Sequence, residues 1–274
     1  YYIRQAASRA LYTDVSDNDL SAASGREMCV LPVVLRGSGM PHRRQADMRN
    51  AILARLPEGD FVVVRAQLER VTMVSGDILQ GAGEPAKSIF FVESGIISLL
   101  APLEQGGRIE IGHVGREGAA GVHAALGADT LTSEITAQSD GVALRADASM
   151  LRGIAEQSPP LRQALNGFAN VLHAQVVQVA ACNGAHEVVQ RLARWLLMVH
   201  DRTDGDTLNL THEVISLMLG VTRPGVTIAA GTLQKSGLIQ YSRGRLTIVD
   251  RRGLEQAACE CYAIVSAYYR SELD

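Results

Sequence analysis

The stretch from Leu210 to Val249 constrains the fold of this 274-residue chain more than any other segment. Thr211 is a favourable helix N-cap residue, and apolar residues follow it at helical spacing. These apolar positions are Val214, Leu217, Met218 and Val221. Gly220 is placed to end this helix, because glycine tolerates the left-handed conformation of a sharp turn. Thr222 then caps a second helix with Pro224 in its first turn, where a missing amide proton costs nothing. Two short helices joined through a glycine predict a helix-turn-helix.

The residues after Gly237 predict two short strands joined by a tight turn at Arg243-Gly244. Such a hairpin would form a wing beside the second helix. The buried face of that helix is expected at Val226, Ala229, Ala230 and Leu233. The whole segment is therefore interpreted as a winged helix.

The exposed side of this winged helix carries the residue types that contact DNA. The candidate DNA-binding residues are Thr222, Arg223, Thr227, Ile228 and Lys235 on the helix, and Arg243 and Arg245 on the wing. Between residues 222 and 252, six basic residues are opposed by Asp250 alone, although the whole chain has a formal net charge of -3. A local positive potential favours phosphate contacts. The alternative is a protein–protein module whose charges only solvate its surface.

The composition indicates a globular chain with 47% hydrophobic and 4% aromatic residues. No apolar run approaches the ~20 residues of a membrane span, and the N-terminus lacks the apolar core of a signal peptide, so we expect a cytoplasmic protein with no membrane partner. The four cysteines, Cys29, Cys182, Cys259 and Cys261, show no zinc-site spacing. Reduced thiols, no metal and no cofactor are expected. No catalytic constellation is recognisable, so an enzyme is not expected.

The N-terminal part differs from the rest of the chain. Residues 1–39 are expected to be a flexible leader or an upstream extension, because residues 14–25 are small and polar. A helix-like stretch follows from Met40, and a further helix is expected from Phe61 to Val71. Short apolar runs separated by glycines then predict a compact β-roll or barrel, which residues 133–148 close.

Three motifs in this β-rich region resemble the cyclic-nucleotide-binding β-roll. They are Gly76-Asp77, Gly83-Glu84-Pro85-Ala86 and Phe91-Val92-Glu93-Ser94-Gly95. With the winged helix behind them, residues 41–255 resemble a Crp/Fnr-family transcription regulator. The resemblance implies an α+β fold with an N-terminal β-roll (a jelly roll), a long dimerisation helix and a C-terminal winged helix-turn-helix. It also implies a homodimer that binds an inverted-repeat operator in double-stranded DNA, with RNA polymerase as a further candidate partner.

The expected parts are a sensor domain at 40–158, a dimerisation helix at 159–183, a winged helix-turn-helix at 184–255 and a C-terminal helix at 256–274. Pro159-Pro160 is expected to break the chain before the long helix, and Asn183-Gly184 to form a hinge after it. The long helix has apolar residues at alternating spacings of four and three, interrupted by Gln175. This seam consists of Leu161, Leu165, Phe168, Leu172 and Val179. It packs either on its own domain or on a second copy, and the resemblance favours the copy.

The resemblance also defines what a cyclic nucleotide would need. Family members that bind one carry a Gly-Glu pair for the ribose and an Arg-Ser or Arg-Thr pair for the phosphate. Here Gly118 and Gly121 remain, but no arginine lies between Gly118 and Ala137, and Glu134 adds a negative charge. We therefore expect that cyclic AMP is not the effector, since a buried phosphate needs a guanidinium. A different small-molecule effector, or none, stays open.

Candidate pocket residues for another anion are Arg108, His113, Arg116, Gly118 and Gly121, unless the charged ones are solvated turn residues. His113 and His123 are also the haem-ligand candidates by residue type, but a structural or solvent-facing role is favoured for both. An iron–sulfur sensor of this family would need several cysteines near the N-terminus, where only Cys29 is present.

Overall fold

The computed structural model describes residues 38–39, 44–104 and 107–273. Most of the expected leader, residues 1–37, lies outside the described residues, as does the start of the helix-like stretch at Met40. Ser38–Gly39 form a short strand, β1, paired with β2. The helix-like stretch contains a 3-10 turn, Gln45–Asp47, and a short helix, α1 (Ala51–Arg55).

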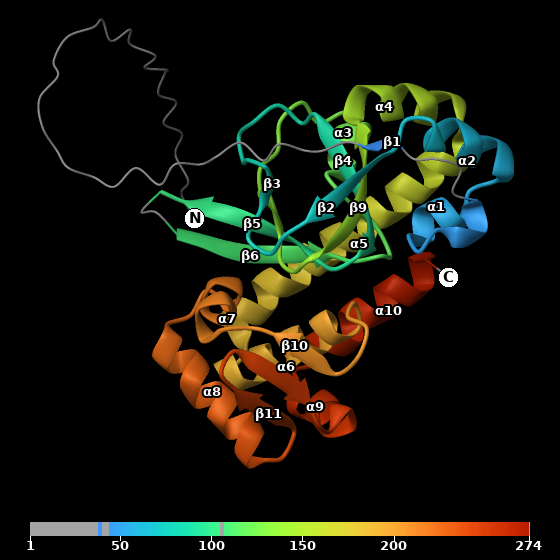
Figure 1. Ribbon diagram of the computed structural model, residues 1–274. Coiled ribbons are helices and arrows are strands. Elements are labelled where there is room, and N and C mark those ends of the chain that lie inside the picture. The colour runs from blue at the N-terminus through green and yellow to red at the C-terminus, as the bar shows by residue number, and fades with distance from the viewer. Residues whose placement is uncertain (1–37, 40–43, 105–106, 274) are drawn as a thin grey trace, which may run out of the picture. The chain divides into compact units, whose positions relative to one another are not determined.

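The β-roll consists of two antiparallel sheets (Figure 1). One sheet has the strand order β1-β2-β9-β4-β7, with β2 at Glu69–Met73, β4 at Ser88–Ser94, β7 at Ala119–Ala120 and β9 at Gly141–Asp147. The other has the order β3-β8-β5-β6, with β3 at Ile78–Gln80, β5 at Ile97–Leu103, β6 at Gly107–Val114 and β8 at Glu134–Ala137. Buried apolar side chains from both sheets form one core.

The helix expected from Phe61 to Val71 is wrong in its second half. Helix α2 spans Glu58–Arg65, and the chain then enters β2. In β2, Val71 and Met73 are buried while Arg70 and Thr72 are exposed, which is the two-residue alternation of a strand. Pairing of β2 with β9 satisfies the backbone and overrides the helical reading of Leu68 and Val71.

The long helix α5 spans Pro159–Ala185, 27 residues, after α3 (Val122–Ala125) and α4 (Ala148–Gln157). Pro159 and Pro160 do not precede the helix but form its first turn, where Ser158 caps the Leu161 amide at 3.1 Å. The hinge expected at Asn183-Gly184 is wrong, because both residues remain helical and the helix continues to Ala185, with His186 as its C-cap.

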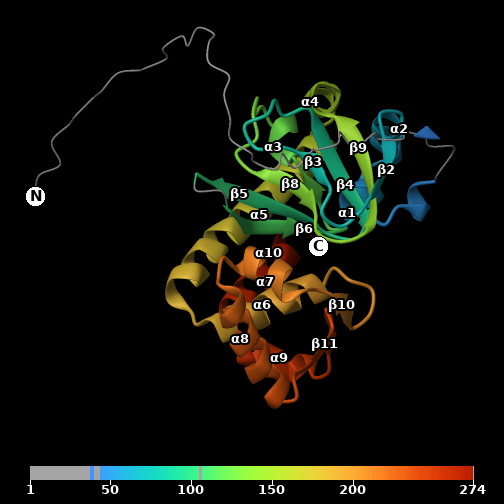
Figure 2. The same ribbon diagram turned by 60° about the vertical axis from the view of Figure 1, so that its left-hand side comes forward.

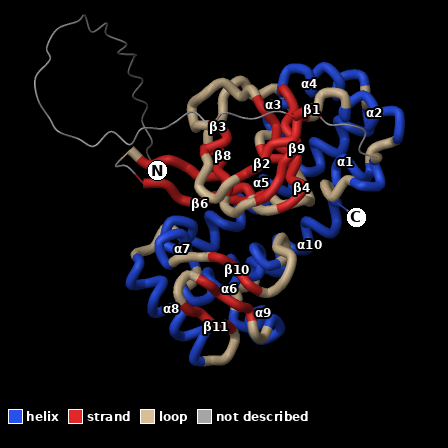
Figure 3. The backbone as a smooth tube through the Cα atoms, viewed as in Figure 1, coloured by secondary structure: helices blue, strands red, loops and turns tan. Residues whose placement is uncertain are grey.

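The C-terminal part contains the winged helix (Figures 1 and 2). Its helices are α6 (Val188–His200), α7 (His212–Leu219), α8 (Arg223–Lys235) and α9 (Arg251–Ala257). Strands β10 (Thr207–Asn209), β11 (Ile239–Ser242) and β12 (Arg245–Ile248) form a sheet in the order β10-β12-β11. Figure 3 shows β10 and β11 of this sheet among the helices. A last helix, α10 (Cys261–Leu273), packs along α5.

Strand β5, together with Ile96 directly before it, contributes to two cores at once. Ile97 and Leu99 lie in the core of the roll, while Ile96 and Leu100 lie in the core of the winged helix. Alternate residues of a strand point to opposite faces, so a strand buried on both faces reads as a continuous apolar run. The run Ile96-Ile97-Ser98-Leu99-Leu100 has this pattern because the winged helix covers the outer face of the roll.

No helix within the described ranges is by itself long and apolar enough to cross a membrane. The pair α7 and α8 passes the same length and composition test only when taken together, across a bend of 105°.

Candidate nucleic-acid interface and interdomain pocket

The helix-turn-helix forms for the local reasons that the sequence suggested. The Thr211 hydroxyl accepts a hydrogen bond from the Val214 amide at 3.2 Å and caps α7. Gly220 ends α7 with a φ of 61°. Thr222 occupies the N-cap position of α8, but its side chain makes no capping hydrogen bond, so the hydroxyl is free of that role. The first turn of α8 therefore begins with an exposed Thr222-Arg223 pair.

One face of α8 is buried and the other is open. The expected buried positions Val226, Ala229, Ala230 and Leu233 are all at most 2% exposed. All five candidate DNA-binding residues of this segment, Thr222, Arg223, Thr227, Ile228 and Lys235, are exposed. Ile228 is 70% exposed, more than any other large apolar side chain among the described residues.

The wing is a tight turn between β11 and β12. Arg243 has a φ of 50° and Gly244 a φ of 79°, so both central residues are left-handed, as in the hairpin turns that match strand twist. Arg243 and Arg245 are both exposed. Arg251, which the charge count included, is instead bound to Asp201 at 2.6 Å and to Glu255 at 3.1 Å. These two carboxylates largely neutralise the charge of Arg251, which links α9 to the end of α6.

A histidine and a tyrosine that the sequence did not single out join the first helix to the wing. The rings of His212 and Tyr241 stack with centroids 4.6 Å apart. Nδ1 of His212 lies 3.0 Å from the hydroxyl of Thr227, a candidate base-contacting residue. Burial, and then the charge of Arg223, lower the pKa of His212, so the ring is neutral at pH 7. The contact to Thr227 suggests that His212 positions this side chain. No local sequence pattern predicts such a role for His212.

The charged residue Arg223 has one weak partner. Its Nη1 lies 3.6 Å from Oε1 of Glu213, and both side chains are largely exposed. An exposed ion pair at this distance contributes little, so the guanidinium can exchange Glu213 for a phosphate or a base edge at small cost.

A buried polar cluster connects the roll to the winged helix. Glu110 accepts hydrogen bonds from the Trp195 indole N–H at 2.7 Å and from the Ser98 hydroxyl at 2.6 Å. Its Oε1 also lies 3.1 Å from Nδ1 of His113, and Nε2 of His113 is buried with no hydrogen-bond partner among the described residues. Glu110 and His113 are only 4% and 1% exposed, so this cluster is sealed from solvent.

The five candidate pocket residues are not gathered into one pocket. Arg108 is paired with Glu134 at 2.5 Å, and Arg116 with Asp204 at 2.9 Å. His113 belongs to the buried cluster around Glu110 and is closed to solvent. His123, the other haem-ligand candidate, is exposed.

Packing and backbone conformation explain why glycine occupies the other two candidate positions, Gly118 and Gly121. A Cβ at Gly118 would lie 1.9 Å from a ring carbon of Phe168, so α5 packs directly on this turn. Gly121 has a φ of 80° and precedes α3. The segment that would bind a cyclic phosphate carries buried Ala119, Ala120 and Val122 and no guanidinium.

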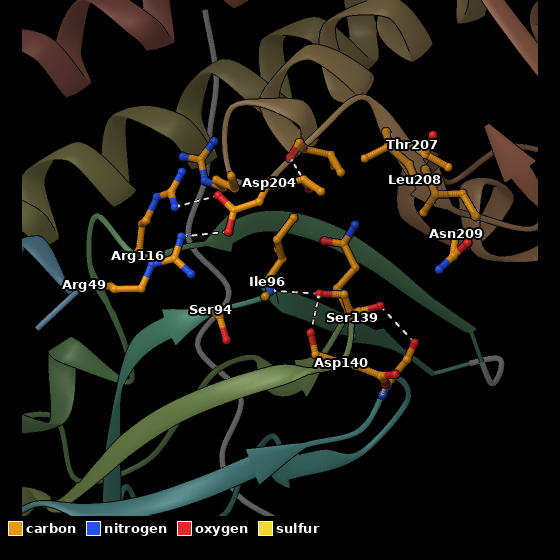
Figure 4. A pocket seen from close by; sticks show the side chains of 17 residues that line it. Arg49, Ser94, Ile96, Arg116, Ser139, Asp140, Asp204, Thr207, Leu208 and Asn209 are labelled. Atoms are coloured by element: carbon orange, nitrogen blue, oxygen red, sulfur yellow. Dashed lines mark hydrogen bonds and ion pairs between the residues drawn. The ribbon is translucent and has the colours of Figure 1, made fainter. Parts of the chain in front are cut away.

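A cavity of about 320 Å³ lies between the roll and the loop that follows α6 (Figure 4). Arg49 and Arg116 hold the two carboxylate oxygens of Asp204 at 2.7 and 2.9 Å. Hydrogen bonds from Arg49 and Arg116 lower the pKa of Asp204. The ion pair is therefore present at neutral pH and is lost as the pH falls through this lowered pKa. Arg49 and Asp204 were not anticipated, because their positions, 155 residues apart, meet only in the fold.

A second ionic contact beside this cavity joins three parts of the chain. Arg202, in the loop just after α6, is bound to Glu117 of the roll at 2.7 Å. Burial alone would raise the pKa of Glu117, but Arg202 and the Gly115 amide lower it below the ordinary value. The guanidinium also lies 4.8 Å above the ring of Tyr269 on α10, a cation–π geometry. The winged helix, the roll and the last helix are thus fixed to one another here.

The expected dimer seam is covered by the chain itself. Leu161, Leu165, Phe168 and Leu172 lie in the core of the roll, each at most 1% exposed. Gln175 donates to the hydroxyl of Tyr269 on α10 at 3.0 Å. Val179 is 7% exposed. The seam was expected to pack either on its own domain or on a second copy. In the structure it packs on its own domain, because the roll and α10 occupy this face of α5.

The opposite face of α5 is open. Its exposed residues Asn166, Asn170, His173, Val177, Ala180 and Gly184 are again spaced by four and three. Val177 is 52% exposed, and the next two positions of this face, Ala180 and Gly184, are small residues. This second seam has the period of a coiled-coil interface.

The fold combines a cyclic-nucleotide-binding-like β-roll, a long connecting helix and a winged helix-turn-helix, which defines a DNA-binding regulator of two parts. Residues 70–158 match the family model of the cyclic nucleotide-binding domain, and residues 190–257 match that of the Crp-like helix-turn-helix domain. Together these matches cover more than half of the chain, which belongs to the Crp/Fnr family of transcription regulators. Among curated protein sequences, none matches this chain significantly.

Solved structures of the family share the fold. FixK2 from Bradyrhizobium japonicum is 17% identical with a TM-score of 0.62, over 70% of this chain and 98% of its own. A transcriptional regulator of the Crp/Fnr family from Eubacterium rectale is 21% identical with a TM-score of 0.61, over 75% and 96%. The c-di-GMP-responsive regulator CLP of Xanthomonas campestris is 16% identical with a TM-score of 0.57, over 70% and 99%.

Proposed function

We propose that this Crp/Fnr-family protein is a dimeric, sequence-specific DNA-binding regulator whose roll does not bind cyclic AMP. The observation that carries the proposal is the open face of α8 beside the wing. All seven candidate residues on these two elements are exposed, and among them only Arg223 has a carboxylate partner within the described part of the chain. Since the chromosome is the partner, the protein acts in the cytoplasm.

Readout of bases is assigned to the start of α8. Thr222, Arg223 and Thr227 lie on its exposed side, and helix-turn-helix proteins present the N-terminal residues of this helix to base edges in the major groove. Pro224 and Ile228 replace the acidic and second basic base-reading residues of better-known family members. An exposed apolar Ile228 suits contact with thymine methyl groups, so the operator should differ from the common consensus.

The dimer is assigned to the open seam of α5. Two copies of this face would pack with Val177 and Ala180 at the centre, and Asn166 or Asn170 would fix the register, as a polar residue in an apolar seam does. A two-fold axis along α5 places two winged helices about 34 Å apart, one turn of DNA. Such a dimer needs an inverted-repeat operator.

The sensor assignment rests on the missing counter-charge. A cyclic phosphate brought into the roll would meet buried Ala119, Ala120 and Val122. An uncompensated buried charge costs several kcal/mol, more than backbone amides of the four-residue helix α3 offset. An effector, if this regulator has one, therefore has a different chemistry. Calorimetry with cyclic AMP, cyclic GMP and cyclic di-GMP tests this.

The test of DNA binding is a salt titration with fragments of the gene's own upstream region. Fluorescence anisotropy from about 50 to 200 mM salt should show log K falling linearly with log salt, because bound phosphates release counterions. Arg270→Ala is the charge-matched control for replacements of Arg223, Arg243 and Arg245 by alanine, since Arg270 is exposed on α10, outside the winged helix. No binding at low salt would refute DNA binding and favour a protein-assembly module. A transcription assay with purified RNA polymerase then separates activation from repression.

A further inference from the structure

Three cysteines and a histidine from three places in the chain converge at the end of α5. Cys182 lies in the last turns of α5 and His186 in the connection to α6, while Cys259 lies between α9 and α10 and Cys261 is the first residue of α10. Their ligand atoms all lie within 4.8 Å of one another. The sequence predicted plain thiols and no metal because these residues show no zinc spacing along the chain. The fold supplies the proximity that the spacing lacks.

The distances fit a tetrahedral zinc ion. The sulfurs of Cys182 and Cys259 are 3.5 Å apart, and the sulfur of Cys261 is 3.5 Å from Nδ1 of His186. Zinc bonds of about 2.3 Å to sulfur and 2.0 Å to nitrogen give a tetrahedron with edges of about 3.5–3.8 Å. An iron–sulfur cluster would place several iron atoms between its ligands and hold the sulfurs farther apart.

The surroundings orient these ligands. Nε2 of His186 lies 3.2 Å from a carboxylate oxygen of Glu260, which leaves Nδ1 facing the sulfurs. A second ring nitrogen bound to a carboxylate is the usual arrangement of a metal-ligating histidine. Gln178 donates a hydrogen bond to the sulfur of Cys261 at 3.1 Å. The three thiols are at most 4% exposed.

Two buried arginines beside the thiols point to a missing negative charge. Arg191 and Arg194 on α6 are 8% and 2% exposed, and the Nε atom of each is buried without a hydrogen-bond partner. In the part of the chain that the structure describes, neither forms an ion pair with a carboxylate. Both lie within electrostatic range of the Cys182 sulfur. Unpaired buried cations are costly. A zinc ion with three thiolates and one neutral histidine carries a net charge of -1, which would offset one of the two positive charges.

We propose that Cys182, His186, Cys259 and Cys261 form a structural Zn²⁺ site. Four protein ligands leave no open position, which is typical of structural rather than catalytic zinc. The ion would bind the start of α10 to the end of α5, next to the connection into the winged helix. This inference rests on the geometry of the four side chains and does not depend on the function proposed above.

The first test is the metal content of the full-length protein purified without chelator. Elemental mass spectrometry should find one zinc per chain. After removal of zinc by a chelator, titration with Co²⁺ should give the visible absorption bands of tetrahedral cobalt and a thiolate charge-transfer band. A protein supplied with zinc that binds neither ion refutes the site, as does a Cys182–Cys259 disulfide found by mass spectrometry in the freshly purified protein.

Variants then assign the ligands. His186→Gln and Cys261→Ser should each lose the stoichiometric zinc or bind it at least tenfold more weakly, whereas Cys29→Ser, which removes the fourth cysteine, should keep it. His186→Gln leaves the thiols unchanged, so it remains informative if Cys261→Ser does not fold. Zinc loss should also lower Tm by several degrees in the wild type and in Cys29→Ser alike. Equal zinc content in all three variants would overturn the assignment.

Discussion

The buried carboxylate of Glu110 gives the most quantitative prediction about how the two parts of the regulator are held together. In Glu110→Ala, the Ser98 hydroxyl keeps a partner, because Oε1 of Gln138 lies 3.0 Å away. The indole N–H of Trp195 and the ring of His113 lose theirs. A buried donor left without an acceptor costs about 1–3 kcal/mol. Two such groups give about 2–6 kcal/mol, and removal of a desolvated carboxylate offsets part of this. We expect a loss of about 2–4 kcal/mol in the free energy of unfolding.

The assay is urea unfolding followed by tryptophan fluorescence. Trp195 is the only tryptophan in the chain, and it lies at this contact, so its emission reports on the cluster directly. Glu156→Ala is the matched control, since Glu156 is exposed on α4 and its replacement should change stability by no more than about 0.5 kcal/mol. If Glu110→Ala is as stable as this control, the cluster does not hold the winged helix to the roll.

Further predictions concern DNA and the dimer. Arg223→Ala should weaken operator binding by about 1–3 kcal/mol if it reads a guanine, and unchanged affinity in a folded variant would exclude that role. Replacing Arg243 and Arg245 by alanine should weaken specific and non-specific DNA alike and reduce the salt slope by about one per lost phosphate contact, whereas a loss at one sequence only would contradict phosphate binding. Val177→Glu should give folded monomers in analytical ultracentrifugation, while Leu172→Glu should destabilise the roll itself, because Leu172 is 1% exposed within one chain. A wild type that is already monomeric at micromolar concentration would refute the dimer.

The parts of the fold that sequence predicted well are those with local causes. The Thr211 cap, the left-handed Gly220 and the Arg243-Gly244 turn are properties of a few adjacent residues, and the structure has all three. The helix expected to continue to Val71 fails for the converse reason. Its last residues pair with β9, more than 70 positions away, and local periodicity contains no information about that partner.

The candidate sites were less predictable because they depend on what covers each surface. The apolar seam of α5 shows that something covers Leu165 and Leu172, but its period is the same whether the cover is a second chain or the roll and α10. Asp204 and its two arginines, and the cluster of Cys182 with Cys259, join residues at separations of 77 to 155. Only the folded chain brings these together.

Because β5 packs in the cores of both the roll and the winged helix, domains of this regulator cannot be exchanged freely with those of its relatives. Domain exchange assumes that a winged helix can be cut off and joined to a new sensor, but here Ile96 and Leu100 of the roll complete the core of the winged helix. A chimera that keeps a foreign roll would leave Trp195 and Leu196 against side chains that were not selected to fit them. The smallest interchangeable unit is therefore the winged helix together with the outward-facing residues of one sensor strand.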